Sequence, residues 1–551
     1  MSIHAWVLRF TPRLLVFLVL ATGCGGASLR RVASPVSLDV PPQIEQAVDL
    51  GALPLPASGP LSTELGDRVF TPGEWVAVLG TGLARSDAQV RVGGRPLPIE
   101  GYLENGLLVR VPRGLPPRAK HTLEVQTARG HAAQPIHFAS YVVVSDVSGN
   151  KLRFLRMSSE AKRLFEEPQD LPLTRVRKHV FSPDGGLIYA VQAHAAEHDG
   201  RYALAVVHAG AAEHPVQLTS VSLPLSGVPV DLVAAHSRRQ LWLLTQRELV
   251  VLDVSDPLSP RESARVALPA GTPWSLAALE GDTRAAVLER EGNQLWFFDM
   301  TGAPPRLAWT FALPPEHTAR ASIALLADRA DTQRLWVLQG RSLARLAGRA
   351  DKLVDSIRSP IERAKEAIGL GAPQPEVEPQ EAPSESEPAP PARVLGLILA
   401  GDAQPVIERE LALPEAFVPL MLRAGVDGRL LVSGISSDAA KLQSVGDAPN
   451  LSNITAWLLG SVQFGRVVAV DPAQVRETET LAQGMAMFFD VDQLADGQLV
   501  YSVMRFGVHG LPPGIGVHWR IEAPHLDAVG IRKLSWTAVL PPYVSPPVGV
   551  Q

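Results

Sequence analysis

Residues 237–254 read SRRQLWLLTQRELVVLDV, and this stretch decides the fold of the larger part of the chain. A polar turn at 237–239 precedes the apolar run Leu241–Leu244, and Leu249–Val254 forms a second apolar run. Apolar runs of this length with little alternation are typical of strands that neighbouring sheets bury on both faces. The stretch therefore predicts two consecutive strands of a sheet that lies inside the protein.

The pattern repeats along the chain with a constant period. Leu-Pro pairs end at Pro224, Pro269 and Pro314, so the interval is 45 residues in both steps. This period lies within the range of propeller blades. Short polar turns between apolar strands recur at 182–185, 237–239, 281–283, 331–333, 427–428 and 496–497. The repeat predicts an all-β chain with a β-propeller over residues 140–545.

One more blade is predicted from the two ends of this region. Residues 140–146 and 151–155 read as the middle strands of a blade that lacks its inner strand. A strand from the far C-terminus, such as Leu534–Val539, would complete it, so seven blades are favoured over six. The segment Tyr141–Val191, with its Ser-Pro-Asp-Gly turn, resembles the YVTN-type propeller repeats of surface and periplasmic proteins.

A smaller strand-rich module is predicted at residues 66–139, where apolar residues alternate with polar ones and the runs break at glycines. This period of two predicts a small sandwich of immunoglobulin type. The module resembles the IPT/TIG family, and the matching positions are Gly80, Gly82, Val90, Val92, Gly93, Val109, Val111, Pro112, Val125 and Gly130. Leu83 stands where that family usually has an aromatic residue. The resemblance implies a spacer or protein-binding module rather than an enzyme.

The N-terminus has the anatomy of an export signal. Arg9 and Arg13 precede the apolar run 14–20, which is too short to span a bilayer. The only cysteine, Cys24, ends this segment, and the sequence around it resembles the lipobox of bacterial lipoproteins. The resemblance implies that residues 1–23 are a signal peptide and that Cys24 is acylated and becomes the mature N-terminus. An ordinary secreted protein with a spare thiol is the alternative.

Lipidation would attach the protein to a lipid bilayer of the cell envelope through Cys24. The residue after the cysteine is Gly25 rather than aspartate, which favours the outer membrane over the inner one, with the protein periplasmic or surface-exposed. Residues 24–65 are rich in Pro, Ser, Ala and Gly and are predicted to form a flexible tether.

Composition excludes one class of partner. The chain has 51 basic and 56 acidic side chains and a net charge of −5, which argues against nucleic acid, and any basic face would have to be local. Two insertions interrupt the repeat. The first contains a predicted helix at 350–368 and a Pro/Glu-rich, disordered stretch at 369–393, and the second covers 436–462.

Few residues suggest a metal site. His194, His198 and Asp199 lie close together, yet they fall in a loop and lack a recognisable further ligand, so a solvated loop is favoured over metal binding. Residues 146–150 are read as a turn rather than a calcium loop. Asp253 and Asp299 end two strands and could line an acidic ring of the kind that holds a metal in propeller lactonases, although strand-end aspartates are more typical of turns.

No nucleophile elbow, phosphate loop or dinucleotide fingerprint occurs in the right context, so no catalytic residue and no cofactor are predicted. Five tryptophans are interpreted as packing between blades: Trp242, Trp296, Trp336, Trp457 and Trp519. The leading hypothesis is a membrane-anchored, non-catalytic binding or scaffold lipoprotein whose propeller face meets an envelope protein or a glycan. The alternative is an exported propeller hydrolase or lactonase with a metal in its central channel.

Overall fold

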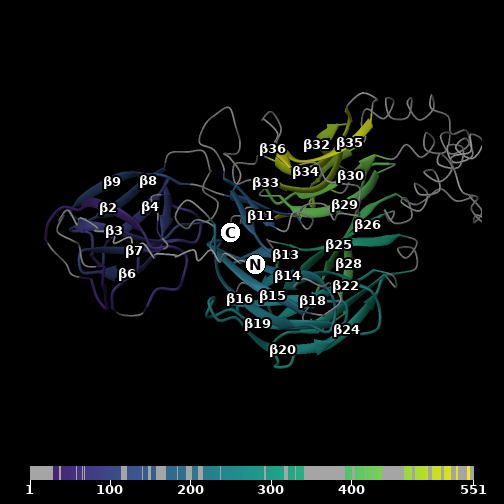
Figure 1. Ribbon diagram of the computed structural model, residues 1–551, viewed down its shortest axis with the longest axis horizontal. Coiled ribbons are helices and arrows are strands. Elements are labelled where there is room, and N and C mark those ends of the chain that lie inside the picture. Colours follow the sequence, from purple (N-terminus) through teal and green to yellow (C-terminus); the bar gives the residue numbers. More distant parts are fainter. Residues whose placement is uncertain are drawn as a thin grey trace, which may run out of the picture.

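The computed structural model describes residues 29–545 apart from internal gaps, the longest of which are 113–120, 157–168, 194–200, 341–390, 437–464 and 532–542. Every helix or strand assigned within these ranges is a strand, so the chain is all-β. The strands form two bodies, a smaller sandwich and a larger ring of sheets (Figure 1). The described ranges contain no helix long and apolar enough to cross a membrane.

The smaller body is a sandwich of two antiparallel sheets. The first sheet has the order β1 (Arg31–Val32), β6 (Ile99–Leu103), β7 (Gly106–Arg110), β3 (Trp75–Thr81) and β2 (Gln43–Asp49). The second sheet has the order β5 (Arg95–Leu97), β4 (Gln89–Val92), β8 (His121–Thr127) and β9 (Gly130–Ile136). Alternating side chains of both sheets, such as Val78 and Val125, meet in one buried cluster. The predicted sandwich at 66–139 is therefore present.

The N-terminal boundary of this body differs from the predicted one. Strand β2 pairs with β3 along its whole length, and Ile44 and Ala47 pack against the core of the sandwich. The prediction of a flexible tether over residues 24–65 is therefore wrong for this part of the segment. Composition does not reveal this strand, because a strand that buries few side chains needs little apolar sequence and is stabilised by its pairing with a neighbour.

Two glycines of the predicted IPT/TIG pattern occupy positions that exclude side chains. Gly82 has φ +64°, and a Cβ there would lie 2.6 Å from the carbonyl O of Val40. Gly93 has φ +56°, and its Cβ would lie 2.6 Å from Nδ1 of His121. Only glycine adopts this left-handed backbone at little cost, so both positions are set by local geometry.

The larger body consists of seven four-stranded antiparallel sheets in the described part of residues 141–545. From inner to outer strand, the first three are β37 (Tyr543–Ser545), β10 (Tyr141–Asp146), β11 (Lys151–Arg156), β12 (Gln169–Pro172); β13 (Val176–Phe181), β14 (Leu187–Ala193), β15 (Arg201–His208), β16 (Val216–Pro224); and β17 (Pro229–Ala235), β18 (Gln240–Thr245), β19 (Glu248–Asp253), β20 (Arg261–Ala267).

The remaining four sheets repeat the same order. They are β21 (Pro273–Leu279), β22 (Arg284–Glu289), β23 (Gln294–Asp299), β24 (Arg306–Ala312); β25 (Ala321–Ala327), β26 (Arg334–Gly340), β27 (Arg393–Ile398), β28 (Val406–Ala412); β29 (Phe417–Ala424), β30 (Leu430–Ser436), β31 (Gly465–Val470), β32 (Thr478–Gly484); and β33 (Ala486–Gln493), β34 (Leu499–His509), β35 (Gly514–Glu522), β36 (Val529–Ile531).

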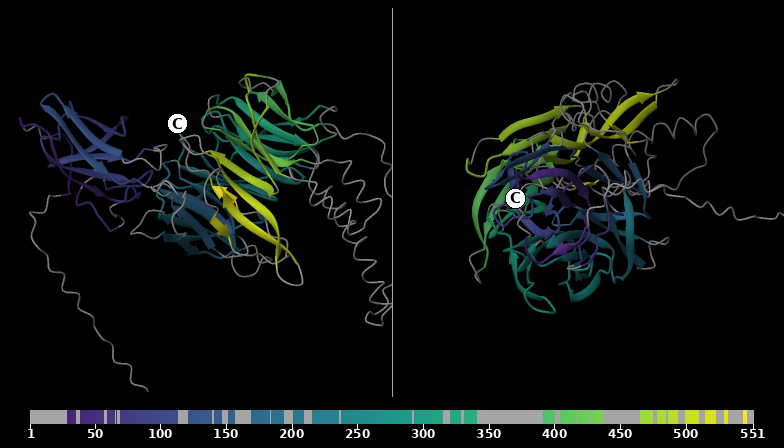
Figure 2. Two further views of the ribbon diagram at one scale, coloured as in Figure 1. Left: turned by 90° about the horizontal axis from the view of Figure 1, so that it is seen from above. Right: turned by 90° about the vertical axis from the view of Figure 1, so that its left-hand side faces the viewer.

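The sheets form a closed ring, which is the β-propeller that the repeat predicts (Figure 2, right). Each inner strand from β13 to β33 contacts the next one along the chain, and β33 contacts β37. Strand β37 pairs with β10, so the C-terminal strand completes the first sheet. The closing strand predicted at Leu534–Val539 lies outside the ranges that the structure describes, and the strand that closes the ring there is Tyr543–Ser545.

The core lies between neighbouring blades. Trp242, Trp296 and Trp336 are buried and pack among aliphatic side chains of adjacent sheets, as predicted. Trp457 and the side chain of Trp519 lie outside the described part of the chain. Each buried indole removes a large apolar surface from water, which makes these residues the largest single contributors to the packing of their blades.

The two insertions lie mostly outside the residues that the structure describes. The predicted helix at 350–368 lies in a range that the structure does not describe, and so does most of the second insertion. The disordered stretch predicted at 369–393 ends too late, because Ala392 is buried and Arg393 begins β27. Arg393 is the first residue of β27, and it pairs with Gln339 of β26.

Candidate functional site

The residues singled out from sequence as metal ligands do not form a described site. His194, His198 and Asp199 lie in an undescribed range. Where residues are described, no three His, Cys, Asp or Glu side chains are close enough to hold a metal ion.

The two strand-end aspartates are turn residues. Asp253 Oδ1 accepts a hydrogen bond of 2.9 Å from the backbone N–H of Ser255, and Asp299 Oδ1 accepts one of 2.8 Å from Thr301. Hydrogen bonds from the side chain and backbone of Ser255 lower the pKa of Asp253, and those of Thr301 do the same for Asp299. Both residues end third strands, so a second strand separates each of them from the inner strand. They do not line an acidic ring around the channel.

A different feature recurs near the N-terminal ends of the inner strands, at one end of the ring. Six inner strands carry a β-bulge close to their first residue, where one extra residue interrupts the pairing with the second strand. The extra residues are Arg177, Val230, Trp274, Ile323, Leu420 and Phe489. Bulges re-aim side chains and are frequent beside functional sites. We call the first five of these residues, together with Lys178, Asp231, Ser275 and Arg290, the channel mouth.

Trp274 is the aromatic residue of the channel mouth. Its side chain is 42% exposed, whereas the tryptophans between the blades are buried. Its Nε1 donates a hydrogen bond of 2.9 Å to the carbonyl O of Ile323 on the next inner strand. The guanidinium carbon of Arg290 lies 4.2 Å from the centre of the indole ring. Two neighbours therefore hold the indole in place while much of its surface remains in contact with water.

Polar side chains of the mouth connect three consecutive blades. Lys178 Nζ lies 3.6 Å from Asp231 Oδ1. Asp231 Oδ2 accepts a hydrogen bond of 2.9 Å from the backbone N–H of Leu276 and one of 3.4 Å from Ser275 Oγ. Since Asp231 already has these donors, its role in the structure is to fix the positions of the inner strands relative to each other.

Two cationic side chains act on His179 of the inner strand β13. His179 is buried, and its burial lowers its pKa to about 3, against a hydrogen bond to the backbone of Val143 that favours protonation. The positive charges of Lys178 and Arg423 lower the pKa further. His179 is therefore neutral at pH 7, and the charges that act on it are cationic.

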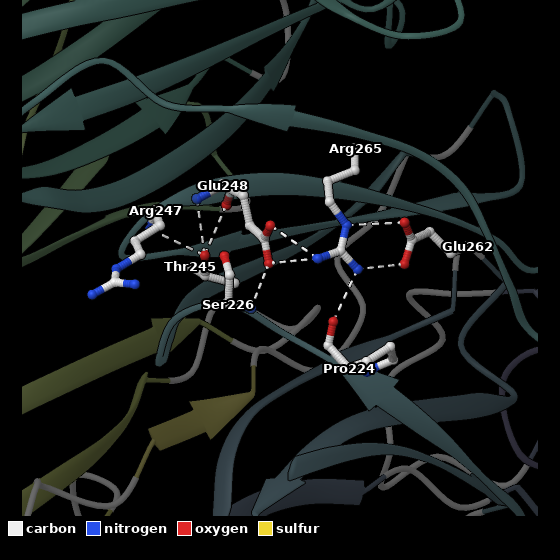
Figure 3. Close-up of polar contacts among 7 residues, drawn as sticks. All are labelled: Pro224, Ser226, Thr245, Arg247, Glu248, Glu262 and Arg265. Carbon is white, nitrogen blue, oxygen red and sulfur yellow. Dashed lines mark hydrogen bonds and ion pairs between the residues drawn. The ribbon is translucent and has the colours of Figure 1, made fainter. Parts of the chain in front are cut away.

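The loops that lead into the inner strands are held by side chains of the neighbouring hairpins. Arg265 lies between two carboxylates, with Nη1 3.0 Å from both oxygens of Glu248 and with Nε and Nη2 bonded to Glu262 (Figure 3). The same Arg265 Nη2 donates to the carbonyl O of Pro224, and Glu248 accepts from the backbone N–H of Ser226. Hydrogen bonds to Glu262, followed by the charge of Glu248, raise the pKa of Arg265.

Equivalent supports occur in the two neighbouring blades. Glu289 accepts a hydrogen bond of 2.9 Å from the backbone N–H of Thr272, and Gln192 accepts one of 3.1 Å from Thr174. In each case a side chain at the hairpin between the second and third strands fixes the loop before an inner strand. Side-chain hydrogen bonds therefore fix the loops that lead into the channel mouth.

The opposite end of the second blade carries the sandwich. The backbone N–H of Ala52 donates a hydrogen bond of 3.0 Å to Nε2 of His208, and Glu74 Oε1 lies 3.6 Å from the same nitrogen. The side chains of Glu74 and His208 are both 0% exposed. Burial lowers the pKa of His208 to about 4, so its imidazole is neutral at pH 7 and Nε2 can accept the Ala52 hydrogen bond.

Close backbone packing completes this contact. Gly73 has φ +84°, and a Cβ there would overlap the backbone N of Gly186 and lie 2.6 Å from the carbonyl O of Asp184. Arg110 Nη2 lies 2.5 Å from Asp184 Oδ2, and Arg110 Nε donates to the carbonyl O of Gly73. Below, the joint means the contacts of Ala52, Gly73, Glu74 and Arg110 with Asp184, Gly186 and His208.

Sequence reasoning missed both the mouth and the joint. The tryptophans interpreted as packing between blades do not include Trp274, although it follows Pro273 and precedes the predicted turn at 281–283, and that position is a usable signal. Nothing local marks Glu74 and His208 as partners, because they are far apart in the chain and meet only once both bodies have folded.

Comparisons with known proteins give a likeness of fold. No family model and no curated protein matches the chain. Among solved structures, a candidate 6-phosphogluconolactonase from Bacteroides fragilis aligns at 9% identity and a TM-score of 0.42, covering 72% of this chain and 96% of that one. The periplasmic gluconolactonase of Pseudomonas aeruginosa aligns at 13% identity and a TM-score of 0.37, covering 80% and 96%.

A third similar structure is the β-propeller domain of Cps50 (Swd1) from Myceliophteria thermophila, at 8% identity and a TM-score of 0.37, covering 69% of this chain and 95% of that one. The first of these proteins is a candidate lactonase, the second a gluconolactonase and the third a propeller domain of another kind. At such identities the likeness carries no argument about activity, so function has to be argued from the residues of this chain.

Proposed function

We propose that the protein is a non-catalytic binding protein of the cell envelope, held on a membrane by acylated Cys24, which presents the channel mouth to a partner. The observation that carries the proposal is the placement of the joint and the mouth at opposite ends of the second blade. The bulge of β13 follows Val176, whereas the joint involves the turn after Phe181. At about 3.3 Å per residue this separation is roughly 17 Å.

This arrangement gives the sandwich a definite role. Cys24 precedes the sandwich in the chain, and the sandwich lies against one end of the propeller (Figure 2, left). A packed, polar joint restricts rotation between two bodies that a simple linker would leave independent. A membrane anchor at Cys24 would then leave the mouth directed away from the lipid, toward an envelope protein or a glycan.

Two finer assignments belong to the proposal. The lipobox-like sequence supports lipidation at Cys24, and Gly25 favours the outer membrane over the inner one. The positive φ of Gly82 and Gly93 supports an IPT/TIG-type spacer, because these are positions of that family's pattern. In this view the spacer carries no ligand of its own and sets the orientation of the propeller.

The anchor is tested by expressing the full chain in a diderm bacterium and comparing it with Cys24→Ala. The wild-type protein should enter the detergent phase on phase separation and carry acyl chains on its N-terminal residue by mass spectrometry. The variant should stay in the aqueous phase as the uncleaved precursor. Equal partitioning of the two proteins would contradict the anchor.

The binding face is tested in the same cells with a photo-crosslinking amino acid at position 274 or at position 307. Leu307 is 43% exposed, close to the value for Trp274, but it lies on the outer strand of the same blade. We expect discrete crosslinked products from position 274 and none from position 307. Products of equal yield from both positions would contradict a binding role for the channel mouth.

A further inference from the structure

We propose that the outer edge of β16, the last strand of the second blade, binds an extended segment of a partner polypeptide as an additional strand. This inference goes beyond the proposed function, because it concerns the outer rim of the propeller rather than the channel mouth. It combines two observations: β16 is the longest of the outer strands, and it has no charged side chain.

Strand β16 has a neighbour on one side. It is the last strand of its sheet and pairs with β15. Within the residues that the structure describes, no other strand pairs with β16 and no backbone hydrogen bond joins it to another segment. Gln217, Ser220 and Ser222 are exposed, so water reaches the strand. The backbone N–H and C=O groups of such an edge are a template for pairing with another chain.

The seven outer strands can be compared, because the structure describes all of them as strands. With nine residues, β16 is the longest, and its sequence VQLTSVSLP has no charged side chain. At least one charged side chain occurs in each of β12, β20, β24, β28 and β32. The remaining outer strand, β36, has three residues. Charged side chains and short length are common protections of a sheet edge against pairing, and β16 has neither.

The part of β16 that can receive a partner strand follows a β-bulge at Leu218. Residues 219–223 pair regularly with β15. Alternate residues of this run lie opposite β15 side chains of the core between the second and third blades, and the others lie on the opposite face: Thr219, Val221 and Leu223, and Ser220 and Ser222. An added strand would continue both rows, so it should alternate apolar side chains with uncharged polar ones.

The orientation of β16 argues against a second copy of this chain as the occupant. In a symmetric pair of β16 edges the strands would run antiparallel, with the start of one beside the end of the other. Val216 at the start pairs with His208 of the joint, whereas Pro224 at the end accepts a hydrogen bond from Arg265 at the mouth end. The two sandwiches would then point in opposite directions. One membrane could not hold both anchors, a step that rests on the proposed lipidation of Cys24.

The test selects peptides from a random displayed library on the full lipidated chain in detergent. We expect the enriched sequences to alternate apolar with uncharged polar side chains. A synthetic peptide of the enriched sequence should slow hydrogen exchange at backbone amides of residues 219–223 about 10-fold. Because only every second N–H of an added strand faces its neighbour, N-methylation of one alternate set of peptide nitrogens should weaken binding about 30-fold, and methylation of the other set should have little effect.

A pair of variants locates the binding site on β16. Ser222→Lys places a charge on the edge and should weaken binding of the peptide about 10-fold. Ala312→Lys is the matched control, because Ala312 is also exposed and occupies the same position after the bulge of β24. This control should bind the peptide as wild type does.

The inference is overturned if no peptide is enriched, or if the enriched peptide leaves hydrogen exchange at residues 219–223 unchanged. Equal binding of both methylated peptides, or equal affinity of Ser222→Lys and wild type, would also contradict it. A dimer of the full chain in sedimentation that Ser222→Lys dissociates would assign the edge to a second copy instead. These failures are distinguishable from failure of the proposed function, because detergent partitioning of Cys24→Ala and crosslinking from position 274 do not involve β16.

Discussion

The two ends of the propeller differ in how far their side chains are exposed. At the joint, Glu74 and His208 are fully buried, and Gly73 allows the backbones of the two bodies to touch. At the channel mouth, Trp274 is held by its neighbours but remains almost half exposed. One end of the propeller is thus covered by the sandwich, and the other end has an exposed aromatic side chain. This arrangement suits a protein that is anchored at one end and binds a partner at the other.

The difference also shows which tryptophans serve stability. Trp242 and Trp274 lie on adjacent blades, and both belong to strands. Trp242 is on a second strand, packed between sheets, whereas Trp274 is on a bulge at the start of an inner strand. The backbone position, rather than the residue type, determines whether an indole becomes core or surface.

The largest expected effect separates these two tryptophans. Trp242→Ala should lower the free energy of unfolding by about 4 kcal/mol, because it leaves a cavity between blades. Trp274→Ala should lower it by less than about 1 kcal/mol, because the side chain is already in contact with water. Urea unfolding of both variants measures the contrast, and similar losses would mean that Trp274 is a structural residue.

The second-largest expected effect is a loss of stability at the joint when the pH is lowered. The pKa of His208 is about 4 in the folded protein and 6.5 for an unperturbed histidine, so the unfolded chain binds the extra proton between these values. Stability that is present above pH 6.5 is therefore lost as the pH falls toward 4, by up to about 3 kcal/mol. His179 has a lowered pKa as well and contributes in the same direction.

The variant His208→Gln isolates the contribution of the joint. A glutamine oxygen can still accept the hydrogen bond from Ala52 but does not titrate. The melting temperature of the variant should fall less steeply than that of wild type between pH 6.5 and pH 4, while the part due to His179 remains in both proteins. Identical pH profiles would show that His208 does not govern the joint.

A smaller loss is expected when the backbone contact at the joint is blocked. Gly73→Ala should cost about 2 kcal/mol, because the new Cβ overlaps Gly186 in a left-handed conformation. Gly59→Ala is the control, since Gly59 also has positive φ but no atom lies within 4 Å of its Cβ position. Limited proteolysis between the two bodies should be accelerated in Gly73→Ala only; equal rates in both variants would argue against a tight joint.

The smallest effect is expected for the side chains that fix the loop before the inner strand of the third blade. Glu248→Gln keeps an acceptor for Ser226 but weakens the pairing with Arg265, and it should cost about 1 kcal/mol. Because these side chains position that loop, hydrogen exchange at Ser226 should become faster. Unchanged exchange would mean that Arg265 and Glu262 suffice to hold the loop.

The repeated parts of the fold could be predicted from the sequence. The period between Pro224, Pro269 and Pro314 and the apolar runs predict blades, and the buried positions of Trp242 and Trp296 confirm the reading of those residues as core. Such features are local, since each blade repeats the same pattern of strand and turn within one stretch of chain.

The candidate site could not be predicted in the same way. A bulge such as that at Trp274 depends on the register between two strands, which single-residue patterns do not specify. The joint depends on the contact of Glu74 with His208, and strand β2 depends on an edge of β3 that only the folded sandwich offers. These properties arise from long-range contacts.

The most direct test of the account measures which end of the propeller faces the membrane. Arg247 and Ser259 are exposed at opposite ends of the third blade, so a dye can be attached to Arg247→Cys or Ser259→Cys in the lipidated chain bound to vesicles with a quencher in the headgroups. The account predicts stronger quenching at position 259, on the side of the joint, than at position 247, on the side of the mouth. Equal quenching, or stronger quenching at position 247, would contradict it.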